Sequence, residues 1–217
     1  MVILFLVTSA INNDVVRLDE TRQTIESIHR RVPTASIWLL ESSLDNQNFR
    51  HPRVVVKHFG HHSFVKEVHS KNREIGYVKS AIEMYTTQAI LPTIPTLFSH
   101  IFKLSGRYTL TDDFDLLAHP ANKATFAEAR ATGFREDYCG TTGMLMTRLY
   151  SFCQTVIPQM IETLGQMREF HEAQWDGEKV FDIEHGYYKF LPSDIRHETS
   201  KIGVRGRIGH LSSIVED

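Results

Sequence analysis

The residues best suited to chemistry follow one apolar segment, His100–Leu104 (HIFKL). Ser105-Gly106-Arg107 comes directly after this segment, and the acidic stretch Asp112-Asp113-Phe114-Asp115 begins a few residues later. Clustered aspartate oxygens can hold Mg²⁺ or Mn²⁺, and such an ion bridges phosphate oxygens and offsets the charge on a leaving diphosphate. An arginine beside several carboxylates therefore suits a nucleoside diphosphate bound with a metal, although acidic residues after a strand are also common in solvent-exposed turns.

Polar loops also follow two other apolar segments, 2–7 (VILFLV) and 36–40 (SIWLL). The first loop begins Thr8-Ser9-Ala10 and supplies hydroxyl and backbone N–H groups, whereas the second begins with Glu41, whose carboxylate suits sugar hydroxyls. In an open α/β sheet, ligands bind outside the carboxyl ends of the strands. We therefore expect both loops and the residues after Leu104 to converge on one cleft.

Further polar residues are candidates for binding phosphates in this cleft. Lys71 and Asn72 open a predicted helix that also holds Lys79, and a helix N-terminus together with ammonium groups favours anions. Arg22 lies about one turn into the first predicted helix and could turn toward the cleft. Solvent-exposed helix charges, or an ion pair between Arg22 and a nearby glutamate, explain these residues equally well. Lys103 lies within an apolar strand, so it requires a carboxylate or a phosphate partner.

The elements that must position these residues alternate between strand and helix in the first half of the chain. The apolar run 2–7, an amphipathic helix from Asp19 to Val32 that stops at Pro33, and the run 36–40 form a predicted βαβ unit. Further predicted elements are strands at 53–58, 100–104, 124–129 and 143–148, and helices at 70–90, 157–170 and 183–191. Because no linker or repeat interrupts the 217 residues, we expect one α/β domain, with a mixed α+β second half.

Composition excludes several classes of protein. The 24 Lys and Arg residues against 26 Asp and Glu residues leave a formal net charge of -2, so we expect no nucleic-acid partner. Cys139 and Cys153 have no CxxC spacing, which argues against a disulfide framework or structural zinc and favours a reducing compartment, the cytoplasm. The apolar N-terminal run is far too short to cross a bilayer, so we expect no membrane span.

The order of several segments resembles small GT-A-type glycosyltransferase domains. These segments are LVTSAIN, ETRQTIESIHRRVP, IWLLESS, IGYVKS, IFKLSGRYTLTDDFD, TTGMLMTRLY and DIEHGYY, and FKLSGRY is the most specific of them. Such domains occur in virus-encoded and bacterial glycan-assembly proteins, among them a chlorella virus protein thought to glycosylate the capsid. The resemblance implies a Rossmann-like GT-A fold, with a mixed central β-sheet flanked by helices. It also implies a nucleotide-sugar donor bound through an Asp-x-Asp motif and a divalent cation.

The resemblance leaves two hypotheses for the diphosphate site. The usual GT-A arrangement places Asp-x-Asp directly after the strand, where this chain reads Ser105-Gly106-Arg107. In the first hypothesis, the following loop folds back so that Asp113 and Asp115 ligate Mn²⁺ or Mg²⁺. In the second, Arg107 replaces the metal by a forked contact to phosphate, for which its planar guanidinium is suited. We favour the first, because the resembling viral domain looks metal-dependent.

The resemblance also divides the chain into a nucleotide-sugar-binding half, 1–115, and an acceptor-side half, 116–217. Asp182 and Glu184 lie at the start of a predicted helix in the second half. An inverting transferase needs a carboxylate to deprotonate the acceptor hydroxyl, and Glu184 is the first choice for this base, before Asp182. Alternatively, Asp182 caps the helix and Glu184 favours its dipole.

The resemblance thus implies a glycosyltransferase that moves a hexose or deoxyhexose from a UDP-sugar to a glycan or glycoprotein acceptor, in the host cytoplasm if the protein is virus-encoded. The predicted donor-binding residues are Thr8, Ser9, Ala10, Arg22, Glu41, Lys71, Asn72, Lys79, Lys103, Ser105, Gly106 and Arg107. One alternative is a non-catalytic nucleotide-sugar or glycan-binding module with the same donor loops. Another is a nucleotidyltransferase, although no glycine-rich triphosphate loop is recognisable near Thr8.

Overall fold

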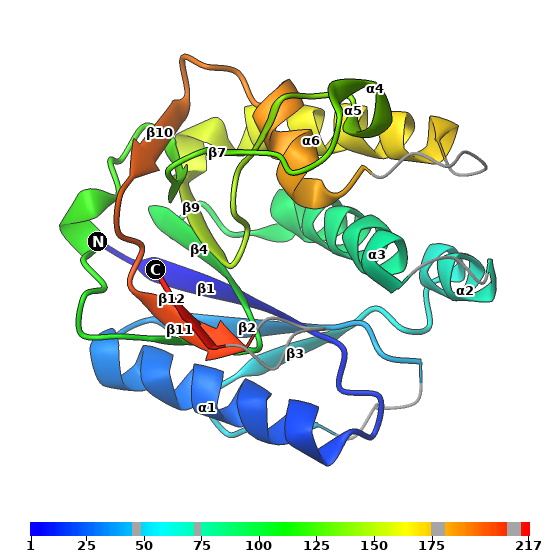
Figure 1. Ribbon diagram of the computed structural model, residues 1–217. Helices are drawn as coiled ribbons and strands as arrows, with labels where there is room; N and C mark the ends of the chain where they lie inside the picture. Colours follow the sequence, from blue (N-terminus) through cyan, green and yellow to red (C-terminus); the bar gives the residue numbers. More distant parts are fainter. Residues whose placement is uncertain (45–48, 72–74, 175–180, 208–213) are drawn as a thin grey trace.

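A computed structural model of the protein describes residues 1–44, 49–71, 75–174, 181–207 and 214–217 (Figure 1). The strands are β1 (Ile3–Ser9), β2 (Ser36–Glu41), β3 (Val55–His58), β4 (His100–Ser105), β5 (Tyr108–Leu110), β6 (Ala124–Ala127), β7 (Arg130–Ala131), β8 (Gly143–Met144), β9 (Leu149–Cys153), β10 (Arg196–Thr199), β11 (Val204–Arg207) and β12 (Ile214–Glu216). The helices are α1 (Val15–Arg31), α2 (Ser63–Ser70), α3 (Ile75–Ile90), α4 (Glu136–Cys139), α5 (Ile157–Ala173) and α6 (Ile183–Phe190), with short 3-10 turns η1 (Leu91–Thr93), η2 (Leu116–Ala118) and η3 (Gln154–Val156).

Within the described residues, the main sheet has seven strands in the order β10-β6-β9-β4-β1-β2-β3. Strands β3, β2, β1 and β4 are parallel neighbours, whereas β9 is antiparallel to both β4 and β6. The expectation of a mixed central sheet flanked by helices is therefore confirmed. Because β1, β2 and β4 run in the same direction, their carboxyl ends reach the same edge of the sheet, as the converging loops require.

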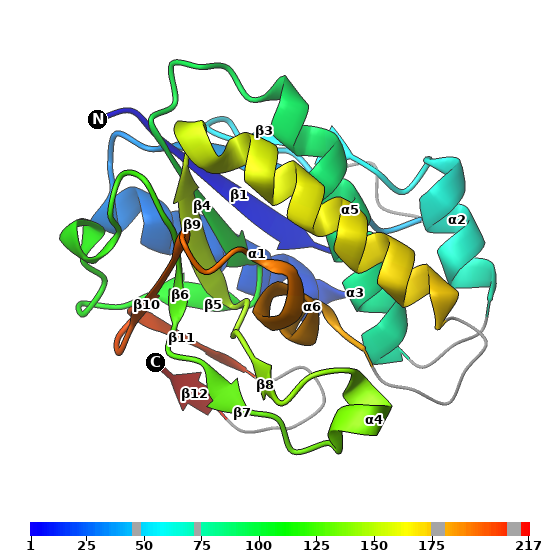
Figure 2. The same cartoon turned by 90° about the horizontal axis from the view of Figure 1, so that it is seen from above.

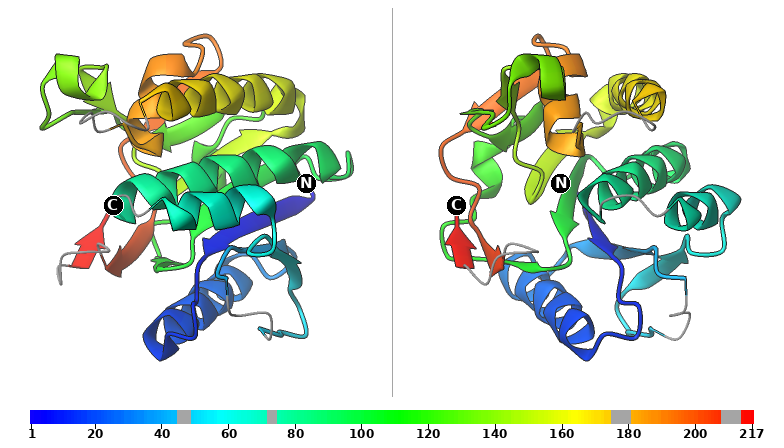
Figure 3. Two further views of the ribbon diagram at one scale, coloured as in Figure 1. Left: turned by 90° about the vertical axis from the view of Figure 1, so that its right-hand side faces the viewer. Right: turned by 45° about the vertical axis from the view of Figure 1, so that its right-hand side comes forward.

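Successive residues of β1 face two separate hydrophobic cores. Leu4 and Leu6 pack in the core beneath α3, α5 and α6, whereas Phe5 and Val7 pack in the core that α1 covers. All four side chains are fully buried, and burial of one such side chain stabilises a fold by roughly 1.5 to 3 kcal/mol. Figure 1 and both views of Figure 3 show α1 on one side of β1 and β2, with α3 on the other. Figure 2 shows α3 and α5 side by side over the sheet.

Helix α1 begins at Val15, four residues before the predicted start. The carboxylate of Asp14 caps the helix by accepting hydrogen bonds from the backbone N–H groups of Val16 (2.8 Å) and Arg17 (3.3 Å). This cap, rather than the acidic pair 19–20, determines where the helix begins. The helix ends at Arg31, in agreement with the predicted stop at Pro33.

Two other predicted elements have different bounds in the structure. The helix predicted over 70–90 is α3, which begins at Ile75. A separate helix, α2, precedes it and was not predicted; it forms because Val65 and Val68 bury one of its faces. The strand predicted over 143–148 is shorter than expected, β8 at Gly143–Met144, and the longer strand β9 follows it, with all five of its residues buried. Among the described residues, no helix combines the length and apolar character needed to cross a bilayer.

Candidate functional site

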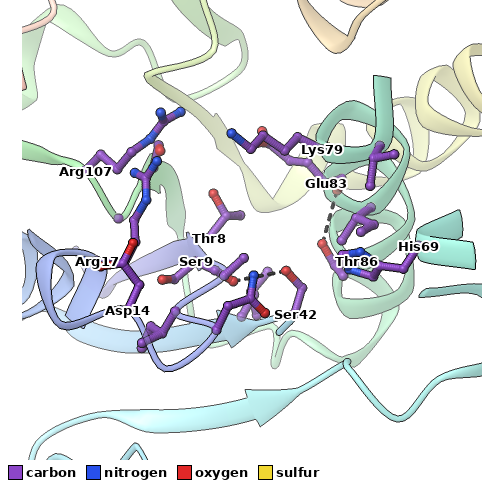
Figure 4. Close-up of a pocket in the computed structure, with 18 residues that line it drawn as sticks. Thr8, Ser9, Asp14, Arg17, Ser42, His69, Lys79, Glu83, Thr86 and Arg107 are labelled. Atoms are coloured by element: carbon purple, nitrogen blue, oxygen red, sulfur yellow. Dashed lines mark hydrogen bonds between the residues drawn. The ribbon is translucent and has the colours of Figure 1, made fainter. Parts of the chain in front are cut away.

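A pocket of about 580 Å³ lies at the carboxyl ends of β1, β2 and β4 (Figure 4). Its volume falls in the usual range for small-ligand sites. One wall is made by α3 and the opposite wall by the start of α1 and the turn after β4. The described lining residues are Thr8, Ser9, Ala10, Ile11, Asn12, Asp14, Arg17, Leu40, Ser42, His69, Val78, Lys79, Ile82, Glu83, Thr86, Ser105, Gly106 and Arg107.

The floor of the pocket is a close crossing between the loop after β1 and the turn after β4. The N–H of Gly106 donates a hydrogen bond to the carbonyl of Thr8 (2.8 Å). A Cβ at Gly106 would lie 3.1 Å from that carbonyl oxygen and 3.3 Å from the Cβ of Ser9, so glycine allows the two backbones to approach. This contact fixes Ser105 and Arg107 on either side of the crossing.

Three cationic side chains face the pocket. Figure 4 shows Arg107 and Lys79 pointing toward each other from opposite walls, with Arg17 extending toward Arg107 from α1. Partial burial, followed by the positive charges of Arg107 and Arg17, lowers the pKa of Lys79. Burial and then Arg17 also lower the pKa of Arg107. The Nη1 atom of Arg107 is buried and has no hydrogen-bond partner within the described part of the chain. The pocket is thus built to attract an anion.

The two carboxylates that line the pocket are already engaged by protein groups. Asp14 caps α1 through its Oδ1 atom, and Glu83 forms an ion pair with the buried ammonium of Lys103. Lys103 is 1% exposed and also donates a hydrogen bond to the carbonyl of Thr147 (3.0 Å). Lys103 therefore finds the carboxylate partner that its place in an apolar strand requires, and it holds Glu83 in the wall of the pocket.

Glu184 lies in the first turn of α6 and is not among the described residues that line the pocket. The hydroxyl of Thr147 donates to Glu184 Oε1 (3.4 Å), so a continuous set of contacts joins Glu83, Lys103, Thr147 and Glu184. Burial, followed by the negative charges of Asp182 and Glu83, raises the pKa of Glu184 to about 7. A carboxylate with this pKa can accept a proton near neutral pH.

Asp182 has a structural position at the start of α6. Its Oδ1 atom accepts hydrogen bonds from the backbone N–H groups of Glu184 (3.1 Å) and His185 (3.0 Å), and it lies 2.7 Å from His185 Nδ1. The other ring nitrogen of His185 contacts the hydroxyl of Thr132 (2.8 Å). These contacts agree with the helix-capping interpretation of Asp182 and leave Glu184 as the better candidate for a base.

The structure brings many of the predicted donor-binding residues together in the pocket. Those that line it are Thr8, Ser9, Ala10, Lys79, Ser105, Gly106 and Arg107. All of them belong to the half of the chain predicted to bind the nucleotide-sugar. Their contact with a donor stays a prediction.

Four other predicted donor-binding residues are not among the described residues that line the pocket. Glu41 is fully buried and accepts hydrogen bonds from the N–H groups of Ile11 (3.1 Å) and Ser43 (2.9 Å), so it ties two loops together. Arg22 is exposed on α1 outside the pocket, Lys71 pairs with Glu67 on α2, and Lys103 is engaged as described above. Asn72 lies outside the described residues.

Asp113 and Asp115 are also placed away from the pocket. Strand β5 carries the chain from Arg107 along α1, so that Asp112 pairs with Arg31 in the last turn of that helix. Arg17 and Arg31 are separated by about 20 Å at 1.5 Å per residue. Asp113 lies 3.7 Å from Lys201, and Asp115 accepts a hydrogen bond from the N–H of Leu117 (2.9 Å). The loop does not fold back in this structure, which removes the geometric basis for the first metal hypothesis.

The residues that line the pocket do not fit a divalent cation. Each of the two lining carboxylates already contacts a protein group, and three cationic side chains, which repel a metal ion, line the same pocket. Across the described ranges, no three His, Cys, Asp or Glu side chains gather as a potential metal set.

Several lining residues were missed by the sequence analysis. Ile82, Glu83 and Thr86 follow Lys79 at helical spacing, so the face of α3 that contains Lys79 could have been extended to them. Arg17 was missed because the predicted helix began too late; recognition of Asp14 as an N-cap would have placed Arg17 in the first turn.

Comparison with solved structures identifies the fold. The chain is similar to a galactosyltransferase, LgtC, solved with donor and acceptor sugar analogues (TM-score 0.56, 12% identity, covering 92% of this chain and 73% of that one). It is also similar to mouse xyloside xylosyltransferase 1 (TM-score 0.50, 10% identity, 91% and 84% covered). A third similar structure is a glycosyltransferase involved in glycosylation of the major capsid of PBCV-1 (TM-score 0.50, 8% identity, 91% and 82% covered).

These similarities confirm the GT-A fold expected from the sequence, including the likeness to a virus-encoded domain. No protein-family model matches the sequence, and no curated protein matches it. At such low identities the comparison establishes architecture, and function must be argued from the pocket.

Proposed function

We propose that the protein is a glycosyltransferase that transfers a hexose or deoxyhexose from a UDP-sugar to a glycan or glycoprotein acceptor. The observation that carries this proposal is the pocket: a GT-A sheet presents hydroxyls, backbone groups and three cations at the carboxyl ends of β1, β2 and β4. This edge of the sheet is where α/β folds bind nucleotides. The similarity to three solved glycosyltransferases supports the same function.

Different parts of the pocket offer different groups to a nucleotide-sugar donor. Arg17, Lys79 and Arg107 provide positive charge for the diphosphate. Thr8 and Ser9 provide hydroxyls on the β1 side, and Ser42 provides another at the end of β2. Such a combination of a charged centre and peripheral hydroxyls suits a nucleotide joined to a sugar through a diphosphate.

Glu184 is the proposed base on the acceptor side. In an inverting transfer, the acceptor oxygen forms a bond to the anomeric carbon while the bond from that carbon to the diphosphate oxygen breaks. The acceptor hydroxyl must lose its proton, and the Glu184 carboxylate accepts it. The pKa of about 7 makes Glu184 a stronger base than an ordinary carboxylate, while it is still substantially ionised near neutral pH.

Lys103 and Glu83 position this base with respect to the donor pocket. The Lys103 ammonium lowers the pKa of Glu184, opposing the rise that burial, Asp182 and Glu83 cause. Since Lys103 also contacts the carboxylate of Glu83, the same buried charge connects the pocket wall with the acceptor side. We assign Lys103 a positioning role, because its contacts are with protein groups.

The proposal is tested by combining donor binding with turnover. Thermal shifts with UDP, GDP, CMP and their sugars would identify the preferred donor, because a ligand that binds the native state raises its apparent stability. Release of UDP from the preferred UDP-sugar is then measured with and without glycan acceptors. Binding without release on any acceptor would indicate a non-catalytic module, and release of pyrophosphate from a nucleoside triphosphate would indicate a nucleotidyltransferase. A preference for GDP-sugars or CMP-sugars would contradict the assignment of UDP.

A further inference from the structure

The turn after β4 has an arginine where the GT-A fold usually provides its second aspartate. We propose that Arg17, Lys79 and Arg107 bind the donor diphosphate directly and take the place of a divalent cation at this site. This inference rests on the proposed function, because it assumes that the pocket receives a diphosphate. It extends the second hypothesis of the sequence analysis, in which Arg107 replaces the metal, and it differs from the metal-dependent first hypothesis that was favoured there.

The first argument is the state of the Arg107 side chain. Arg107 is half-buried, it lines the pocket, and its Nη1 atom has no hydrogen-bond partner within the described residues. A buried, charged donor without a partner is costly, and an acceptor in the pocket would remove that cost. The planar guanidinium can donate two parallel hydrogen bonds to phosphate oxygens, a geometry that a lysine cannot reproduce.

The second argument is the gathering of like charges. Burial, followed by the positive charge of neighbouring arginines, lowers the pKa values of Lys79 and Arg107 and so disfavours their charged forms. Arg17 contributes to both shifts from its position in the first turn of α1, where its Nη1 atom also contacts Glu20 (3.1 Å). Like charges that gather in one pocket are stabilised together when an anion binds there.

The third argument is the absence of available metal ligands in the described part of the pocket. Asp14 caps α1 through its Oδ1 atom, and Glu83 pairs with Lys103, so each of the two lining carboxylates already serves a protein group. Recruiting Glu83 to a metal would also leave the Lys103 ammonium buried without its charge partner, which is strongly unfavourable. Protein cations therefore supply the positive charge in this pocket.

These cations have a direct role in the transfer step. When the bond between the anomeric carbon and the diphosphate oxygen breaks, its electron pair stays on that oxygen. Arg17, Lys79 and Arg107 stabilise the resulting negative charge from fixed positions, as a divalent cation does in other phosphate-releasing sites. No additional co-reactant is required.

The test is calorimetric titration with two probes, UDP and inorganic pyrophosphate, each in EDTA and in Mn²⁺. We expect both probes to bind equally well in the two conditions, with an affinity that falls as salt is added. Arg107→Ala should weaken binding about tenfold to a hundredfold, the usual effect of losing a hydrogen bond to a charged group. Arg107→Lys should recover only part of this loss, and Lys79→Met and Arg17→Gln should each weaken binding as well. Arg30→Ala is the matched control, because Arg30 is exposed on α1.

The outcomes separate this inference from the proposed function. If UDP binds only with Mn²⁺, or if Arg107→Ala and Arg107→Lys both bind like the parent, the cation site is refuted while a metal-dependent transferase remains. If pyrophosphate binds in EDTA and Arg107→Ala abolishes this binding, but no nucleotide binds, the cation site stands and the proposed function fails. If neither probe binds in either condition, both proposals fail. Melting temperatures of all variants distinguish a lost contact from a lost fold.

Discussion

Glu184→Gln should stabilise the protein at pH 8 and have a much smaller effect at pH 5. The pKa of Glu184 rises from 4.5 in the unfolded chain to about 7 in the folded protein. Between these values the folded state binds more protons than the unfolded chain, so stability falls as pH rises, and the loss is complete above the folded pKa. At 1.36 kcal/mol per pH unit, ionised Glu184 costs at most about 3 kcal/mol at pH 8 and less than about 1 kcal/mol at pH 5. Solvent screening of the half-buried side chain reduces both figures.

The measurement is a series of melting curves from pH 5 to pH 8. For a chain of this length, 1 kcal/mol shifts the melting temperature by about 2 to 4 °C, so the advantage of Glu184→Gln should grow by roughly 4 to 8 °C across the series. Glu162→Gln is the control, because Glu162 is exposed on α5, and its difference from the parent should stay constant with pH. In the same variant, transfer should fall about 10²-fold to 10⁴-fold with donor affinity unchanged.

Two results would refute this reasoning separately. A constant difference in melting temperature between Glu184→Gln and the parent would show that the folded protein does not raise the pKa of this carboxyl. Transfer near the parental rate would show that Glu184 is not the base. In the parent protein, kcat should also fall as the pH drops below about 7, because protonated Glu184 cannot accept the proton of the acceptor.

Three further predictions concern the pocket and its support. Replacing Ser105 and Arg107 together by aspartate should create the usual Asp-x-Asp pair, so UDP binding should become dependent on Mn²⁺; calorimetry that shows unchanged binding in EDTA would contradict this. Lys103→Met should lower the free energy of unfolding by about 3 kcal/mol in denaturant titrations, because Glu83 loses its buried partner. UDP affinity should change less than threefold, and a loss of affinity without a loss of stability would show that Lys103 belongs to the donor site. Gly106→Ala should cost about 1 to 3 kcal/mol by the same titration, because its Cβ would press on the Thr8 carbonyl; an unchanged midpoint would show that the crossing can relax.

Much of the fold could be predicted from local sequence patterns. The continuous apolar run before Thr8 indicated a strand covered on both faces, and β1 has this environment. Pro33 indicated the end of α1, and the repeated strand-helix order indicated the parallel sheet. Strand β9 was missed because the strand was placed a few residues earlier, at 143–148, and the identity of Leu149–Cys153 as a strand depends on pairing with β4 and β6.

The candidate site was less predictable, because side-chain direction depends on tertiary contacts. The positions of Ser105, Gly106 and Arg107 followed from the end of β4, which local sequence indicates well. Asp113 and Asp115 looked like metal ligands by type and spacing, but pairing between β5 and β11 directs them away from the pocket. Glu41 illustrates the same limit: it has the right place in the sequence, yet its carboxylate turns inward to bind the N–H groups of Ile11 and Ser43.

The membership of β1 in both hydrophobic cores has a consequence for cooperativity. Because Leu4 and Leu6 face one core while Phe5 and Val7 face the other, neither layer can separate from the sheet without exposing a strand that the other layer needs. We therefore expect the backbone amides of β1, which is paired with β2 and β4, to exchange with deuterium only through global unfolding. Exchange at these amides would then report the free energy of unfolding of the whole sheet, and the floor of the pocket would keep its shape until that sheet is lost.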